Sequence, residues 1–260
     1  MMKTDKIIEH IVQWLRDYLD QSGLQGFTVG VSGGIDSAVS STLCALTGKR
    51  LIALNMPIYQ AKDQLSRASQ HISRLEEQFF NVKGLDIELT PIFEQMETSF
   101  PSDIQDGLTM ANTRSRLRML TLYAVASHHK LLVVGTGNKV EDFGIGFFTK
   151  YGDGGGDISP IADLMKSEVY ALGKELGIQE EILKAPPTDG LWEDNRNDEE
   201  QIGASYAELE WAMQYIASGE TGKLTEQKQK VLKRFKQLNA ANQHKIKPIP
   251  VCLIPDELRV

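Results

Sequence analysis

The stretch GVSGGIDSAVS, residues 30–40, contains two adjacent glycines that are flanked by serines and followed by an aspartate. Gly33 and Gly34 would let the backbone turn sharply and approach a ligand closely. The free N–H groups of the following helix favour an anion by roughly 0.3–1 kcal/mol for each nearby charge. Asp36 would be repelled by a phosphate unless a divalent cation lay between them, so the pattern indicates a Mg²⁺-dependent phosphate site. The alternative is a plain Gly-Gly turn that opens a capped helix.

A second glycine-rich segment, GTGNKVE at residues 135–141, follows the apolar run KLLVV. Both glycine segments thus come at the carboxyl end of an expected strand, which is where parallel sheets bind ligands. Asp36 and Glu141 follow two different strands, so their carboxylates can converge on one cation. Otherwise they are a surface acid and a helix acid.

The elements that must position these residues alternate between strands and helices. Hydrophobic periodicity predicts a first helix over 4–21, with Thr4 as its N-cap and Gly23 as its end. Further strands are expected at 27–31, 50–58, 81–89 and 130–138, and further helices at 36–46, 61–79, 112–127, 163–177, 199–217 and 224–240. This alternation predicts an α/β fold, with a Rossmann-like doubly wound parallel sheet that carries helices on both faces.

Two segments after residue 140 lack a regular pattern. FGIGFFTKYGDGGGDISP, residues 143–160, has too many glycines for a regular element. KAPPTDGLWEDNRNDEE, residues 184–200, is polar and contains prolines, so we expect an exposed loop that could act as a lid.

Composition limits the class of protein. The 260 residues carry 41% hydrophobic residues and a net charge of −7, which fits one globular domain over 1–260 and argues mildly against a nucleic-acid partner. Cys44 and Cys252 have no metal-binding spacing. Charges interrupt any signal-peptide core, and no apolar stretch is long enough to span a bilayer. We therefore expect a cytoplasmic protein without a membrane partner.

The SGGIDS stretch resembles the PP-loop of the N-type ATP pyrophosphatases. In that family the loop holds the β- and γ-phosphates while an acceptor attacks the α-phosphate, and no P-loop lysine is needed. The resemblance implies an adenine nucleotide alpha hydrolase-like fold. It leaves several activities open, among them GMP, asparagine and argininosuccinate synthesis and tRNA thiolation.

LLVVGTGNKVEDFGIGFFTKYGDGGGDISP, followed by the helix at 163–177, closely resembles the NAD synthetases, and the similarity extends from residue 30 to His244 and Lys245. The resemblance implies synthesis of NAD from deamido-NAD, ATP and ammonia through an adenylated intermediate. It also implies a homodimer whose substrate site is shared across the interface.

The resemblance assigns roles to individual residues. Asp36 and Glu141 would bind Mg²⁺, and Asp36, Lys166 and Thr188 would be catalytic. The residues implied at ATP are Gly30, Val31, Ser32, Gly33, Gly34, Ile35, Asp36, Ser37, Thr136, Lys166 and Thr188. The residues implied at deamido-NAD are Arg116, Lys150, Asp157, His244 and Lys245. Ile246 stands where the family commonly has a basic residue.

Each assignment has a simpler alternative. Lys166 could neutralise charge on departing pyrophosphate, or merely extend from an amphipathic helix towards water. Arg114 and Arg118 share a helix face that could be a solvated basic surface, whereas Arg116 points elsewhere. The YGDGGGD glycines could form an unliganded surface loop, and the pair at 244–245 could be two surface residues.

Other functions remain open on the residues alone. A glutamine-dependent enzyme needs an amidase region with a reactive cysteine, and Cys44 fits a helix core better, so free ammonia is the expected donor, delivered directly or by a separate partner. A tRNA-modifying PP-loop enzyme would carry a basic face. A nucleotide-binding module without catalysis would have no need of Asp36, Glu141 and Lys166.

Overall fold

A computed structural model describes residues 2–188, 190–192 and 197–259. Its centre is a parallel sheet with strand order β3-β2-β1-β4. The strands are β1 (Gly26–Gly30), β2 (Arg50–Asn55), β3 (Val82–Asp86) and β4 (Leu132–Val133). An isolated parallel bridge between Val134 and Ile158 continues the edge beyond β4. The predicted α/β fold with a parallel sheet is confirmed.

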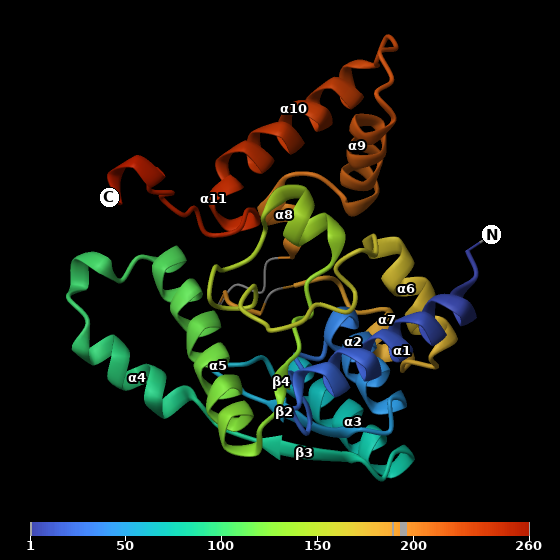
Figure 1. Cartoon of the computed structure of the whole chain (residues 1–260), viewed down its shortest axis with the longest axis vertical. Helices are drawn as coiled ribbons and strands as arrows, with labels where there is room; N and C mark the ends of the chain where they lie inside the picture. The colour runs from blue at the N-terminus through green and yellow to red at the C-terminus, as the bar shows by residue number, and fades with distance from the viewer. Residues whose placement is uncertain (1, 189, 193–196, 260) are drawn as a thin grey trace.

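Helices cover both faces of the sheet (Figure 1). The first five are α1 (Thr4–Ser22), α2 (Ile35–Leu46), α3 (Lys62–Gln78), α4 (Thr90–Ser99) and α5 (Gly107–His129). The later ones are α6 (Lys166–Glu175), α7 (Glu180–Leu183), α8 (Asp198–Ile202), α9 (Tyr206–Ser218), α10 (Glu226–Ala241) and α11 (Gln243–Ile246). Two 3-10 turns, η1 (Ser102–Ile104) and η3 (Asp256–Leu258), and a π-helix, η2 (Lys139–Ile145), complete the elements.

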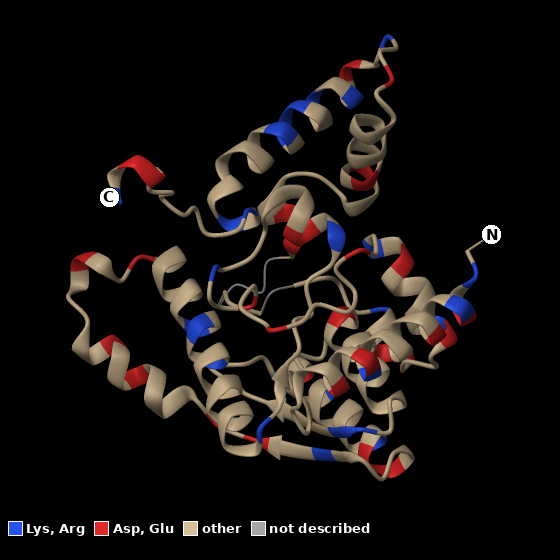
Figure 2. Ribbon diagram, in the orientation of Figure 1, with Lys and Arg blue, Asp and Glu red and all other residues tan. Residues whose placement is uncertain are grey.

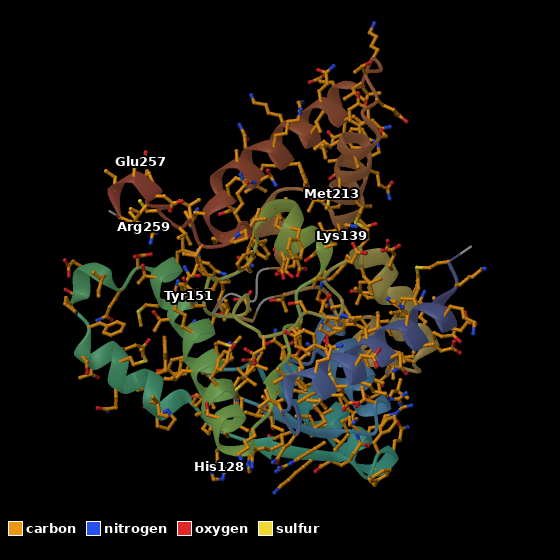
Figure 3. All side chains as sticks on the ribbon, in the orientation of Figure 1. His128, Lys139, Tyr151, Met213, Glu257 and Arg259 are labelled. Carbon is orange, nitrogen blue, oxygen red and sulfur yellow. The ribbon has the colours of Figure 1, made fainter. Side chains whose placement is uncertain are left out.

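Side chains alternate between two hydrophobic clusters along the strands. In β2, Leu51 and Ala53 pack with α1, α2, α3 and α6, whereas Ile52 and Leu54 pack with α4 and α5. Strands buried on both faces explain the nearly continuous apolar runs in the sequence. A third cluster joins η2 to α9 and α10, where Met213 packs on Gly144 (Figure 3). None of the described helices has both the length and the apolar character needed to cross a membrane.

Several predicted element ends were wrong. Lys3, not Thr4, is the N-cap of α1, and no side chain caps it, while Gly23 ends the helix as expected with φ 70°. The helix predicted over 199–217 is divided into α8 and α9, because Gly203 takes a left-handed conformation with φ 77°. Helix α4 was not predicted, and α5 begins at 107 because Asp106 caps it by accepting a hydrogen bond from the Thr109 N–H.

A buried histidine predicts that acid weakens the fold. His71 is 2% exposed, and its Nε2 lies 2.9 Å from the Ser41 hydroxyl, which joins α3 to α2. Burial lowers the pKa of His71 to about 4, and the nearby Arg74 charge adds to this. An unfolded histidine has a pKa near 6.5, so protons favour the unfolded chain below that pH.

We expect the free energy of unfolding to lose about 2 kcal/mol from this group between pH 7.5 and pH 5. In His71→Gln this part of the pH dependence should disappear. Urea titrations of both proteins at several pH values measure it. Parallel pH curves for the two proteins would contradict the assignment.

Candidate active site

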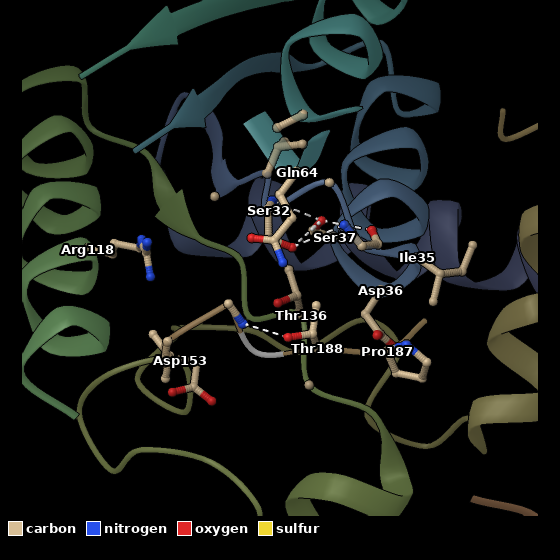
Figure 4. A pocket seen from close by; sticks show the side chains of 18 of the residues that line it. Ser32, Ile35, Asp36, Ser37, Gln64, Arg118, Thr136, Asp153, Pro187 and Thr188 are labelled. Atoms are coloured by element: carbon tan, nitrogen blue, oxygen red, sulfur yellow. Dashed lines mark hydrogen bonds between the residues drawn. The ribbon is translucent and has the colours of Figure 1, made fainter. Parts of the chain in front are cut away.

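A cavity opens at the carboxyl end of the sheet, and the sequence-predicted phosphate loop forms part of its wall. Figure 4 shows the loop residues facing Thr136 and the segment around Pro187 and Thr188. All residues implied at ATP line this cavity, together with Glu141. Asn55, Gln60, Gln64, Arg67, Arg118, Asp142, Asp153 and Asp198 also line it and were not predicted.

The loop between β1 and α2 is held by its serines. The Ser32 N–H donates to Ser37 Oγ at 3.2 Å, and the two hydroxyl oxygens lie 3.1 Å apart. The Ser37 hydroxyl donates to the Gly34 carbonyl at 3.0 Å. Because these bonds close the turn internally, the loop is formed before any ligand arrives.

Of the two adjacent glycine positions, only one must be glycine for the turn to form. Gly33 has φ +83°, and a Cβ there would lie 2.7 Å from the carbonyl oxygen of Gln64. Gly34 has φ −96°, and a Cβ there would meet only the Ser32 hydroxyl, at 3.4 Å. The left-handed turn therefore depends on Gly33.

We expect Gly33→Ala to lower the free energy of unfolding by about 2 kcal/mol more than Gly34→Ala does. The cause is the positive φ together with the backbone contact. Urea unfolding of the two variants checks the difference directly. Equal losses in both would show that the turn does not have this geometry.

Asp36 and Glu141 converge, as their placement at two strand ends suggested, and Lys166 meets them in one cluster. Lys166 Nζ lies 2.6 Å from Asp36 Oδ2 and 3.0 Å from Glu141 Oε1. The lysine side chain is 4% exposed, and the two carboxylates are 19% and 15% exposed. Lys166 is the first residue of α6, so it does not simply extend into water.

The three groups shift one another's ionisation. Burial raises the pKa of Asp36, and the charge of Glu141 adds to this. Burial also acts on Glu141, but the Lys166 charge and the Tyr206 hydroxyl outweigh it and lower its pKa. Burial opposes the charge on Lys166 too, yet both carboxylates raise its pKa. The lysine therefore remains a cation at neutral pH.

Two further side chains hold this cluster, and neither was predicted. Asn138 precedes η2, and its Nδ2 donates to Asp36 Oδ1 at 3.1 Å. Tyr206, the first residue of α9, donates its hydroxyl hydrogen to Glu141, and its ring lies 4.7 Å from Lys166 Nζ. Burial and the neighbouring Glu141 charge raise the pKa of Tyr206, so it stays a donor.

The predicted lid lies partly outside the described residues. Within 184–200, residues 189 and 193–196 are not described. The described part reaches the cavity through Ala185, Pro186, Pro187, Thr188, Gly190 and Leu191. Thr188 lines the cavity, and its hydroxyl accepts a hydrogen bond from the Gly190 N–H at 3.2 Å.

The three arginines of α5 have different surroundings. Arg114 is 7% exposed, and its guanidinium lies 4.9 Å from the centre of the Phe93 ring. Arg118 lines the cavity and donates to the Met56 carbonyl at 2.9 Å. The solvated basic face considered for these two residues is wrong, because Arg114 is buried against α4 and half-buried Arg118 faces the cavity and bonds to the residue after β2. Arg116 does point elsewhere, and its Nε donates to the Lys150 carbonyl at 3.2 Å.

The residues implied at deamido-NAD lie outside the cavity wall, and most of them gather nearby. Lys150 Nζ donates to the His244 carbonyl at 2.7 Å, and Lys245 Nζ donates to the Phe148 carbonyl at 2.7 Å. Together with Arg116 they form a basic cluster between α5, the glycine-rich loop and α11. Figure 2 shows positive residues on α5 and along α10.

Asp157 has different partners from the rest of that set. It accepts hydrogen bonds from the Tyr123 hydroxyl at 2.7 Å and from the Val133 N–H at 2.8 Å. These bonds tie the glycine-rich loop to β4 and α5. The structure therefore brings Arg116, Lys150, His244 and Lys245 together, whereas the hydrogen bonds of Asp157 connect it to α5 and β4.

Comparisons with known proteins agree with this arrangement. Residues 7–249 match the NAD synthase family. The chain is 34% identical over 263 residues to the NH(3)-dependent NAD(+) synthetase of Syntrophomonas wolfei, covering 99% of this chain and 100% of that relative.

Two solved structures share the fold over nearly the whole chain. The NMN synthetase from Francisella tularensis has a TM-score of 0.84 and 32% identity, covering 98% of this chain and 100% of that one. The NH3-dependent NAD synthetase from Campylobacter jejuni has a TM-score of 0.80 and 27% identity, covering 97% and 100%. The chain thus belongs to the NAD synthase family of ligases, whose members carry out the ATP-dependent amidation of deamido-NAD that completes NAD biosynthesis.

Proposed function

We propose that this chain makes NAD from deamido-NAD, ATP and ammonia. The observation that carries the proposal is the placement of Lys166 Nζ between Asp36 and Glu141, in the cavity that the SGGIDS loop lines. The carboxylate of deamido-NAD attacks the α-phosphate of ATP, the bond to the β-phosphate breaks, and pyrophosphate leaves. Ammonia then attacks the adenylated carboxyl carbon, AMP leaves, and the lost proton passes to solvent.

The protein's part in the first step is positioning and charge stabilisation. The N–H groups at the start of α2 and the hydroxyls of Ser32 and Ser37 hold the β- and γ-phosphates. Lys166 neutralises charge on the departing pyrophosphate, and Thr136 and Thr188 bind ATP from the opposite wall. No covalent enzyme intermediate is required.

The charges around the cavity fit a divalent cation. Its described wall carries the acids Asp36, Glu141, Asp142, Asp153 and Asp198 and the cations Arg67, Arg118 and Lys166. A cavity with more carboxylates than cations disfavours a polyphosphate unless metal ions accompany it. Among the described residues, no three His, Cys, Asp or Glu side chains form a metal cluster. Mg²⁺ suits this, because it binds through one or two carboxylates plus phosphate oxygens and water.

We assign Asp36 and Glu141 as the two protein ligands of Mg²⁺. A bound ion would supply Lewis-acid charge at the phosphates. Asp142 lies on the same cavity wall, where burial together with the Glu141 charge holds its pKa well above its usual value and so favours its neutral form. Lys166 would leave the carboxylates and turn to the phosphates when ATP and the ion bind.

We assign deamido-NAD to the cluster of Arg116, Lys150, His244 and Lys245, with Asp157 shaping the loop beside it. Exposed apolar side chains on η1, on α5 and in the C-terminal segment support a homodimer. These are Ile104, Leu108, Leu120, Val251, Leu253 and Leu258. Light scattering after size exclusion should give twice the mass of one chain.

Free ammonia is the proposed nitrogen donor. Cys44 is buried in α2, and burial raises the pKa of its thiol, so it is not a reactive thiolate. Cys252 lies in the exposed C-terminal segment, away from the cavity. We propose that residues 1–260 act as one domain, in the cytoplasm, where ATP and dinucleotides are made and used.

A second candidate substrate follows from the similarity to the structure named NMN synthetase. NMN is the mononucleotide half of NAD, so the same amidation could be made on nicotinate mononucleotide. The basic cluster outside the cavity favours the dinucleotide, because it can hold a second phosphate. The kcat/KM values for deamido-NAD and for nicotinate mononucleotide separate the two.

Exchange of labelled pyrophosphate into ATP, without ammonia, tests the adenylation step. We expect exchange that depends on deamido-NAD, because pyrophosphate is released before ammonia is needed. Labelled ATP formed without deamido-NAD would contradict the proposal. A protein that makes NAD but shows no pyrophosphate exchange in the presence of deamido-NAD would also contradict it. Exchange supported only by the mononucleotide would favour the second candidate.

A further inference from the structure

Asn138 is fully buried, and its side-chain amide contacts both parts of the candidate metal site. Its Oδ1 accepts hydrogen bonds from the N–H groups of Val140 and Glu141, at 3.1 and 3.2 Å. Its Nδ2 donates to Asp36 Oδ1 at 3.1 Å. One amide group thus caps the π-helix that carries Glu141 and holds the carboxylate of Asp36.

The partners allow only one orientation of this amide. Both groups that face Oδ1 are N–H donors, and the group that faces Nδ2 is a carboxylate, which accepts when ionised. A rotated amide would lose all three hydrogen bonds. The side chain therefore fixes the start of η2 relative to the start of α2, which are 102 residues apart in the chain.

We propose that Asn138 is a positioning residue that sets the relative placement of Asp36 and Glu141 for a divalent cation; this rests on the proposed function. Lys166 also joins these two residues, through an ion pair with each carboxylate. In the proposed reaction that lysine turns to ATP, and Asn138 then remains as the link. Because its amide is neutral, it holds Asp36 without neutralising the charge that attracts the cation.

The substitution Asn138→Ser separates the two roles of Asn138, which are to cap η2 and to hold the carboxylate of Asp36. The serine hydroxyl is a good N-cap, so Asn138→Ser should keep the start of η2. Serine lacks the amide N–H group that reaches Asp36, so the carboxylate of this proposed metal ligand is no longer held. Loss of such a hydrogen bond to a metal ligand typically weakens metal binding by about 10- to 100-fold.

The test measures Mn²⁺ binding by electron paramagnetic resonance, with the full chain and α,β-methylene-ATP, which cannot be cleaved between those phosphates. We expect the Kd for Mn²⁺ to rise at least about 10-fold in Asn138→Ser. The Mg²⁺ concentration for half-maximal NAD formation should rise in parallel. Thr225→Ala is the control, because it removes the N-cap of α10 away from the cavity. It should lower the Tm and leave the Kd for Mn²⁺ unchanged.

Asn138→Asp is the second variant, and it keeps the proposal testable if the serine variant does not fold. It retains the cap acceptor and places a carboxylate against Asp36. Repulsion should lower kcat at saturating Mg²⁺ at least about 10-fold, while the KM for deamido-NAD stays within about twofold.

The outcomes separate this inference from the proposed function. A wild-type protein that binds Mn²⁺ and makes NAD, with variants whose Kd and kcat lie within about twofold of it, overturns the role of Asn138 alone. A wild-type protein that makes no NAD overturns the proposed function. Altered Mn²⁺ binding in Asn138→Ser would even then support the positioning role.

Discussion

Asp36→Ala is expected to reduce NAD formation about 1,000-fold and to leave the fold intact. Asp36 is the one side chain that joins the phosphate loop to the proposed Mg²⁺, so its loss removes charge stabilisation at the α-phosphate. The fold should tolerate the change because burial and Glu141 raise the pKa of Asp36, which means that its charged form gains little from folding. Lys166 keeps Glu141 as its partner in the variant.

Steady-state assays for NAD and thermal unfolding measured side by side check this result. Asp20→Ala is a matched control, because Asp20 is an exposed acid paired with Lys49 at 2.7 Å on the surface. That control should leave both activity and Tm unchanged. Activity in Asp36→Ala near that of the control would refute the metal-ligand role.

Lys166→Met should reduce NAD formation at least about 100-fold, because one preorganised cation is lost from the leaving pyrophosphate. It should also weaken the fold, since it leaves Asp36 and Glu141 close together without their shared cation. Breaking such a buried ion pair costs about 3 kcal/mol or more at neutral pH. Methionine keeps the unbranched shape of the side chain and is only one heavy atom shorter, so packing changes little.

The stability loss in Lys166→Met should depend on pH. Without the lysine, mutual repulsion raises the folded-state pKa values of the two carboxylates, and the folded form then takes up protons more readily than the unfolded form. The loss relative to wild type should therefore shrink as pH falls from 8 to 5.5. Urea unfolding at both pH values, with Lys49→Met as the surface control, measures it. A loss that grew on acidification would contradict the ion cluster.

The sheet and the loop that opens the site were predictable from local sequence. Strands buried on both faces must be apolar at nearly every position, as in 51–54, and a glycine must follow where the chain turns with positive φ, as at Gly33. The sequence also holds the signals that could have predicted the break between α8 and α9. Gly203 can end a helix, and Ser205 with Glu208 forms a capping box that begins the next.

The residues that hold the site could not be found in the same way. Tyr206 reaches Glu141 across 65 positions, and Asn138 reaches Asp36 across 102. No periodicity or spacing links residues so far apart. The burial of Arg114 could not be predicted either, because it lies in a basic run of the sequence that gave no sign of its contacts with Phe93 and Leu191. Tertiary packing decides these contacts.

One assay tests the central claim most directly. The protein is incubated with ATP, Mg²⁺, deamido-NAD and ammonium, and the products are separated. The proposed reaction predicts NAD, AMP and pyrophosphate in equal amounts, with none formed when deamido-NAD is omitted. ADP and phosphate as the products, or ATP cleavage that does not depend on deamido-NAD, would contradict it.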